Sequence, residues 1–276
     1  MPILSALNYY NAGDLITMLP GLQKLHQETG QKVTIYQKLD FPAFYYAGAE
    51  HPVKDKEGQQ VCVNQSMFTM LKPLLEAQEY IESYLVWQGE KVDLDFSATR
   101  DSKRVPLPYG NIHHWVFMIF PELACDLSHE WLLPAHDEKG QVIDSYKELM
   151  AGRVVINRTS RYTNPYIHYY FLKKYENKLV FAGTEEERLD FCEKWGLSIP
   201  KLHCYDFYEL ATMIYCADGF IGNQSLCWHL ADAMKVPRVL EYCPMYPNTH
   251  PTGANGYAAV YQEALELYIE KMFNHE

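Results

Sequence analysis

A short turn in the last quarter of the chain has the residue types of an anion-binding site. Residues 219–237 read as a brief strand, the turn Gly222-Asn223-Gln224-Ser225, and a helix. Glycine permits a tight turn, Ser225 can cap the helix, and a helix start presents unpaired N–H groups at the positive end of its dipole. Such a start can hold a phosphate. The same pattern also occurs as plain structure in α/β domains, so both interpretations stay open.

A second group of hydrogen-bond donors follows the apolar segment 153–157. It consists of the neighbours Arg158, Thr159, Ser160 and Arg161. Guanidinium and hydroxyl groups match phosphate oxygens in geometry and charge. Residues 151–180 carry six basic side chains and one acidic side chain, a local net charge of +5 in a chain of net charge −11. This loop is either a phosphate site or a solvated basic face.

Two carboxylates also stand at positions where they could do chemistry. Asp14 lies in the first turn of a helical pattern that follows the apolar segment 3–7. It could remove a proton from a hydroxyl group, or it could simply favour the helix start electrostatically. Glu241 ends the apolar segment 239–240 and is a candidate acceptor for a ribose hydroxyl.

Repeated strand-helix-strand patterns would bring these groups together. Apolar strands are expected at 3–7, 33–36, 92–96, 153–157, 178–181, 219–221 and 239–240, and helices at 15–29, 64–78, 166–175, 185–195, 206–216, 226–234 and 257–273. Ligand sites of open parallel sheets lie at the carboxyl ends of the strands. The loops 158–165, 222–225 and 241–250 therefore predict a nucleoside-diphosphate site in the second half.

The middle of the chain gives weaker signals. Residues 109–131 look like two short helices split at Pro121 and are rich in aromatic groups, which suit either a sugar ring or an ordinary core. Adjacent His113 and His114 point apart on a helix and predict no metal site. The polar segment 134–140 favours a boundary, with domains at 1–145 and 146–276.

Composition limits the classes of function. The chain has 276 residues, of which 48% are hydrophobic, enough for one large or two ordinary domains. The net charge of −11 opposes general attraction to nucleic acid or an anionic membrane. Seven scattered cysteines and no basic-then-apolar leader at Met1 predict reduced thiols in a cytoplasmic protein. No apolar run is long enough to span a membrane, so at most peripheral contact is expected.

Two segments resemble signatures of one known family. The segment from Gly13-Asp14 to Leu22 resembles the start of the heptosyltransferase-like glycosyltransferases, the ADP-heptose:lipopolysaccharide heptosyltransferases, and Phe220 to Pro237, with His229, resembles their second signature. The resemblance implies an α/β, GT-B-like fold of two Rossmann-like domains facing across a cleft. It places the acceptor in the first domain and the nucleotide sugar in the second.

The resemblance also implies roles. Transfer would proceed with inversion and without a metal, the nucleotide-diphosphate sugar being a co-substrate and no cofactor being needed. Asp14 would be the catalytic base, and Arg158 or Arg161 would neutralise the leaving group. The remaining donor-site residues would be Thr159, Ser160, Gly222, Asn223, Gln224, Ser225 and His229.

The chain departs from the second signature at two positions. Gln224 replaces an aspartate and Leu226 replaces a glycine, which removes a charge and restricts backbone approach to a phosphate. Two hypotheses follow: a glycosyltransferase acting on a glycan or lipid-linked acceptor, and an inactive relative that binds a nucleotide, a glycan or a protein. A sugar-nucleotide epimerase is a third reading, for which the sequence offers no obvious acid–base cluster.

Overall fold

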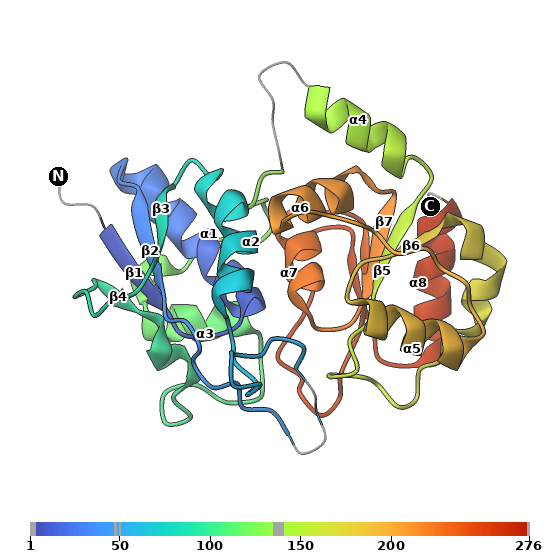
Figure 1. The fold of residues 1–276 in the computed structure, drawn as a ribbon, viewed down its shortest axis with the longest axis horizontal. Helices are drawn as coiled ribbons and strands as arrows, with labels where there is room; N and C mark the ends of the chain where they lie inside the picture. Colours follow the sequence, from blue (N-terminus) through green and yellow to red (C-terminus); the bar gives the residue numbers. More distant parts are fainter. Residues whose placement is uncertain (1–3, 47–48, 50, 135–140, 275–276) are drawn as a thin grey trace.

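The computed structural model describes residues 4–46, 49, 51–134 and 141–274. These residues form two parallel β-sheets, with strand orders β3-β2-β1-β4 and β6-β5-β7-β8-β9. Figure 1 shows the sheets on either side of a central layer of helices. The predicted α/β, GT-B-like fold class is confirmed.

The first sheet belongs to the N-terminal half. Its elements are β1 (Leu4–Asn8), α1 (Ala12–Thr29), β2 (Val33–Gln37), α2 (Gln65–Glu76), β3 (Ile81–Val86) and β4 (Leu94–Asp95), followed by η1 (Phe96–Arg100), α3 (Ile112–Ile119) and η2 (Pro121–Leu123). Helix α1 forms as predicted, because Leu15, Met18, Leu19 and Leu22 recur at helical spacing and are all buried. It ends at Gly30, which adopts a left-handed conformation with φ of 68°.

The second sheet belongs to the C-terminal half. Its elements are α4 (Gln141–Met150), β5 (Val154–Asn157), η3 (Tyr170–Lys178), β6 (Leu179–Phe181), α5 (Glu185–Trp195), α6 (Phe207–Cys216), β7 (Gly219–Gly222), α7 (Leu226–Ala233), β8 (Arg238–Glu241), β9 (Gly256–Ala259) and α8 (Gln262–Asn274). Strand β5 lies between β6 and β7. The loops after β5, β7 and β8 therefore leave the same edge of the sheet.

Several element predictions were wrong in detail. Residues 81–86, for which the sequence predicted no strand, form β3. The helix expected at 166–175 is the later 3₁₀ helix η3. The helix expected at 257–273 starts at Gln262, because residues 256–259 instead pair with β8 as the edge strand β9. The predicted strand start at Ile3 and most of the polar segment 134–140 lie outside the described residues.

The two halves share one hydrophobic core. Buried residues of α1 and α2 and buried residues of α6 and α7 belong to a single cluster, which includes Leu19, Leu71, Leu210 and Trp228. In Figure 1 these four helices fill the space between the sheets. A second cluster lies within the C-terminal half, around α5 and α8.

The domain division at 145/146 remains a prediction. That position falls inside α4, which packs against α6 of the second half. The aromatic middle segment, for which the sequence left two readings open, contributes to the core: Trp115 and Trp131 are each 1% exposed. These two rings therefore offer no surface to a sugar.

Candidate functional site

The two signature segments meet where α1 and α7 begin. A Cβ atom at Gly13 would lie 2.9 Å from Cδ2 of His229 and 3.8 Å from Cα of Leu226. The missing side chain at Gly13 thus allows the start of α1 to lie directly on the start of α7. Asp14 of the first half is thereby brought beside the helix start of the second half.

Asp14 is buried and paired. It forms an ion pair with Arg100, the last residue of η1, and its Oδ2 lies 3.5 Å from Nδ2 of Asn11. The Arg100 guanidinium stacks over Trp115, 4.9 Å from the ring centre, and lies 5.7 Å from the Tyr10 ring centre. Burial lowers the pKa of Arg100 to about 10, so it remains a cation at neutral pH. Nothing in the sequence near Arg100 had indicated this contact.

The turn after β7 fixes the loop after β5. Asn223 accepts a hydrogen bond from the Thr159 N–H at 3.0 Å and donates through Nδ2 to the carbonyls of Thr159 at 3.0 Å and Arg161 at 2.6 Å. Ser225 caps α7 as predicted and accepts from the Trp228 N–H at 3.2 Å. The predicted turn and the predicted basic loop are therefore neighbours, and Asn223 connects them.

Four further predicted site residues lie in these two loops. Thr159 is buried, and its hydroxyl donates to the Arg161 carbonyl at 3.1 Å. Ser160 is exposed. A Cβ atom at Gly222 would lie 2.6 Å from the Asn157 carbonyl oxygen. Gln224 is 9% exposed beside the helix start.

Arg158 and Glu241 bind each other rather than facing open space. Arg158 Nε and Nη2 donate to the Glu241 carboxylate at 2.7 and 3.1 Å. Glu241 is fully buried, and it also accepts from the Tyr169 hydroxyl at 2.7 Å and from the Asn164 N–H at 2.6 Å. Both of its oxygens are thus occupied by protein donors. In this conformation Glu241 presents no acceptor to a ribose, and Arg158 serves as its counter-ion.

Arg161 is different, because its described contacts leave donor capacity unused. It is 8% exposed and forms no ion pair with a carboxylate in the described part of the chain. Its Nη1 contacts Nδ1 of His51, which lies in the loop after β2, and its guanidinium lies 5.0 Å from the Tyr45 ring centre. Arg161 Nε is buried without a hydrogen-bond partner. The loops of both halves therefore meet at this cation.

His51 is a partner of Arg161 from the other half. Burial, and then the nearby Arg161 charge, lower the pKa of His51 to about 3, whereas hydrogen bonding to the backbone of Cys62 and Val61 acts in the opposite direction, so the ring is neutral at neutral pH. Since Nδ1 accepts from Arg161, the ring proton resides on Nε2, on the side of the ring away from Arg161. The buried Arg161 Nε is therefore the donor that a bound anion would satisfy.

His229 lies at the junction of α1 and α7 and is 5% exposed. Burial lowers its pKa to about 4; the charge of Asp232 opposes this shift and that of Arg100 adds to it. The ring is thus neutral at neutral pH and lies between the halves beside Gly13. Its position connects the two signature segments.

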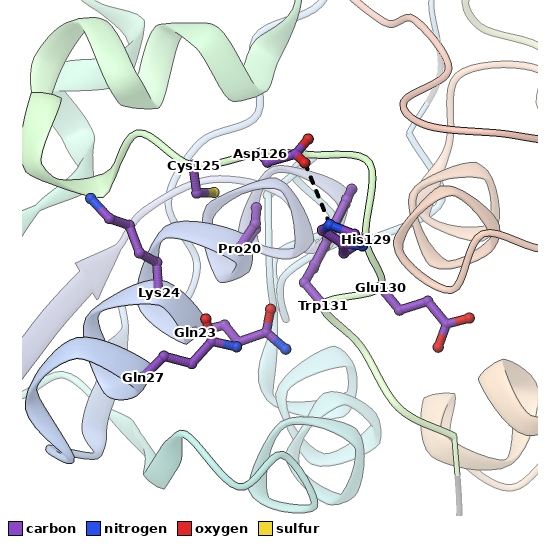
Figure 2. Close-up of a pocket in the computed structure, with 9 residues that line it drawn as sticks. All are labelled: Pro20, Gln23, Lys24, Gln27, Cys125, Asp126, His129, Glu130 and Trp131. Carbon is purple, nitrogen blue, oxygen red and sulfur yellow. Dashed lines mark ion pairs between the residues drawn. The ribbon is translucent and has the colours of Figure 1, made fainter.

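Two cavities lie elsewhere on the described structure. One, of about 370 Å³, is lined by α1 residues such as Lys24 and by the segment 125–131 (Figure 2). The other, of about 560 Å³, lies between the segments 110–128 and 250–253. Neither is lined by a residue predicted for the donor site or for catalysis, although both are lined in part by the segment 109–131, for which the sequence left a sugar contact open. The predicted residues instead form a closely packed junction.

Neither a candidate metal site nor a candidate membrane-spanning helix is found among the described residues. The His, Cys, Asp and Glu side chains placed there form no group of three suited to hold a metal ion. Of the helices in those same ranges, none combines the length and apolar character needed to cross a bilayer.

Comparisons with known proteins give structural matches only. No protein-family model and no curated protein sequence matches the chain. A family 9 glycosyl transferase of Veillonella parvula is similar in structure, with a TM-score of 0.63 and 12% identity over 99% of this chain and 97% of the other. ADP-heptose lipopolysaccharide heptosyltransferase II of E. coli gives 0.60 and 12% identity over 99% of both chains.

A third similar structure is a complex with a nucleotide-sugar analogue. The E. coli heptosyltransferase WaaC with ADP-2-deoxy-2-fluoro heptose gives a TM-score of 0.58 and 13% identity over 98% of this chain and 99% of the other. At such low identity the likeness concerns the fold. The resemblance suggested by the two signature segments is confirmed at that level: this chain has the fold of the heptosyltransferase-like glycosyltransferases.

Proposed function

We propose that this chain is a glycosyltransferase that moves a sugar from a nucleoside-diphosphate donor to a hydroxyl group of an acceptor. One observation carries the proposal: the Gly13 contact brings the start of α1, which carries the buried carboxylate Asp14, onto the helix start that follows β7. Group transfer with inversion requires a base for the acceptor hydroxyl and positive groups for the departing diphosphate. The junction supplies residues of both kinds.

The roles follow from the contacts. Asp14 takes the proton from the acceptor hydroxyl, and Arg100 holds the carboxylate in position. Arg161, held by its contact with His51, provides donors for the diphosphate, together with the N–H groups at the start of α7. Arg158, predicted as a phosphate ligand, instead supports the loop through Glu241. Transfer with inversion and without a metal ion belongs to this proposal.

The alternative is a binding protein of the same fold without activity. It is favoured by the pairing of Asp14 with Arg100, which occupies a carboxylate oxygen that a base would use. Leu226 at the start of α7, in place of the glycine of the family signature, favours it as well. Under this alternative, the protein binds a nucleotide, a glycan or a protein, and no sugar is transferred.

Two measurements separate these functions. Thermal-shift titrations with UDP, GDP, ADP, CDP and TDP identify the nucleotide, since ligand at ~100 Kd stabilises the folded state by roughly 2.7 kcal/mol. Donor turnover by Asp14→Asn is then compared with that of the unaltered chain. We expect a loss of about 100-fold or more with nucleotide binding unchanged, because a positioned base contributes about 10² to 10⁴ in rate.

One control variant and two alternative outcomes complete this test. Asp144→Asn changes an exposed aspartate on α4 and should leave turnover unaltered. Nucleotide binding without turnover of any donor would establish the binding-protein alternative. Failure of all five diphosphates to bind would contradict the proposed glycosyltransferase and leave the alternative of an inactive relative that binds a glycan or a protein.

A further inference from the structure

The carboxyl edge of the first sheet carries a row of aromatic rings. Tyr9 follows β1, Phe41 lies in the loop after β2, and Trp87 directly follows β3. The Tyr9 ring centre lies 5.3 Å from that of Phe41 and 5.9 Å from that of Trp87. All three rings remain partly exposed. Three different loops thus contribute to one aromatic surface.

This surface continues to Asp14. The Tyr10 ring centre lies 6.0 Å from that of Phe41 on one side and 5.7 Å from the Arg100 guanidinium on the other. Arg100 in turn forms the ion pair with Asp14. A ligand lying along the rings would therefore have one end near the proposed base.

The polar groups around the rings suit a ligand with hydroxyl groups rather than a charged ligand. Lys38 Nζ lies 5.0 Å from the Trp87 ring centre, and the exposed Asp95 carboxylate is close enough to influence Tyr9 electrostatically. The charges of Lys38 and Asp95 offset each other, and Arg100 is offset by its ion pair with Asp14, while the whole chain carries a net charge of −11. An anionic ligand gains nothing from such a field.

We propose that this aromatic edge, formed by Tyr9, Tyr10, Phe41 and Trp87, is the acceptor subsite and that it takes an uncharged saccharide. Sugar faces stack on the rings, while Lys38 and Asp95 bind hydroxyl groups. The inference rests on the proposed glycosyl transfer, because it uses the path from the rings to Asp14. It adds the chemical class of the acceptor, which the fold does not specify.

The test is direct binding of defined probes to the full chain. The neutral trisaccharides maltotriose, cellotriose, chitotriose and mannotriose, and the acidic trigalacturonate, are titrated with saturation-transfer NMR as the readout. At least one neutral probe should bind more tightly than trigalacturonate. Trp87→Ala should weaken that binding about fivefold or more, and Trp87→Phe should retain most of it because a ring remains.

A control variant and a separate measurement distinguish a loss of the saccharide site from other effects of a substitution. Tyr205→Ala removes a ring that is 92% exposed on the second half and should not change saccharide binding. Tighter binding of trigalacturonate, no binding of any neutral probe, or equal binding by Trp87→Ala would each overturn the proposal. Diphosphate binding, measured separately, tests the proposed function, so the two can fail independently.

Discussion

At the scale of single residues, the unusual feature of the site is a buried charged donor that the protein does not satisfy. Leaving a buried donor unpaired costs about 1 to 3 kcal/mol. Arg161 Nε is such a donor, and its guanidinium already contacts His51 of the first half. A phosphate group bound at Arg161 Nε would recover this free energy.

Arg161→Ala should therefore weaken nucleoside-diphosphate binding by about 10-fold or more, since hydrogen bonds to charged groups contribute roughly 1.5 to 3 kcal/mol. Arg153→Ala is the matched control, because Arg153 precedes β5 whereas Arg161 follows it. Isothermal titration of both variants with the diphosphate found by thermal shift checks the expectation. Equal affinities for the two variants would contradict the assignment of Arg161.

Residue types with a local signal could be predicted from the sequence, and residues without one could not. Ser225 was found because a helix cap has a recognisable place before an apolar run. Asp14 was found for a similar reason. Arg100 and His51 reach the site from the irregular middle of the chain, where no strand-turn-helix pattern marks them. Glu241 was expected to face a ligand, but no sequence pattern revealed that Arg158 would cover it.

At the scale of elements, β7 shows why glycine is required at one position and merely accommodated at another. A Cβ atom at Gly222 would lie 2.6 Å from the carbonyl oxygen of Asn157, which the paired strand β5 holds in place. A Cβ atom at Gly219 would meet the Met272 sulfur at 2.5 Å, and a methionine side chain can move aside.

Gly222→Ala should destabilise the protein by roughly 1 to 3 kcal/mol, as overpacking does in a rigid environment. Gly219→Ala on the same strand should cost less, because only the end of a flexible side chain must shift. Urea denaturation of both variants compares their free energies of unfolding. A larger loss for Gly219→Ala would show that the contact with Asn157 does not limit β7.

Elements were predicted better than their edges. Helices such as α1 and α5 appear at nearly the expected residues. Strand β9 was mistaken for the start of a helix because its pairing with β8 is a tertiary contact that local propensity does not report. Strand β3 was missed within a stretch that also contains turn residues.

At the scale of the whole molecule, buried neutral histidines make stability depend on pH. The pKa of His113 is lowered to about 3, first by burial, and those of His51 and His229 to about 3 and about 4. The unfolded chain binds these protons near pH 6.5, so it takes up more protons than the folded chain below that pH. The free energy of unfolding must therefore fall as the pH drops from about 6.5 towards 4.

His51→Gln should reduce this pH dependence by up to about 1.4 kcal/mol per pH unit between pH 4 and 6, since one such titration is removed. His129→Gln changes a side chain that is 84% exposed and should leave the slope as it is. Denaturation curves at several pH values give the slopes. An unchanged slope for His51→Gln would mean that His51 is not buried and neutral in solution.

The core shared by α1, α2, α6 and α7 has a consequence for protein engineering. In a chimaera, the first half of this chain would meet a foreign second half whose α6 and α7 were shaped for other partners, and buried apolar surface would be left mismatched. Donor preference is therefore better altered by exchanging the loops that follow β5 and β7 than by transplanting a whole half. Such grafts leave the common interior of the molecule intact.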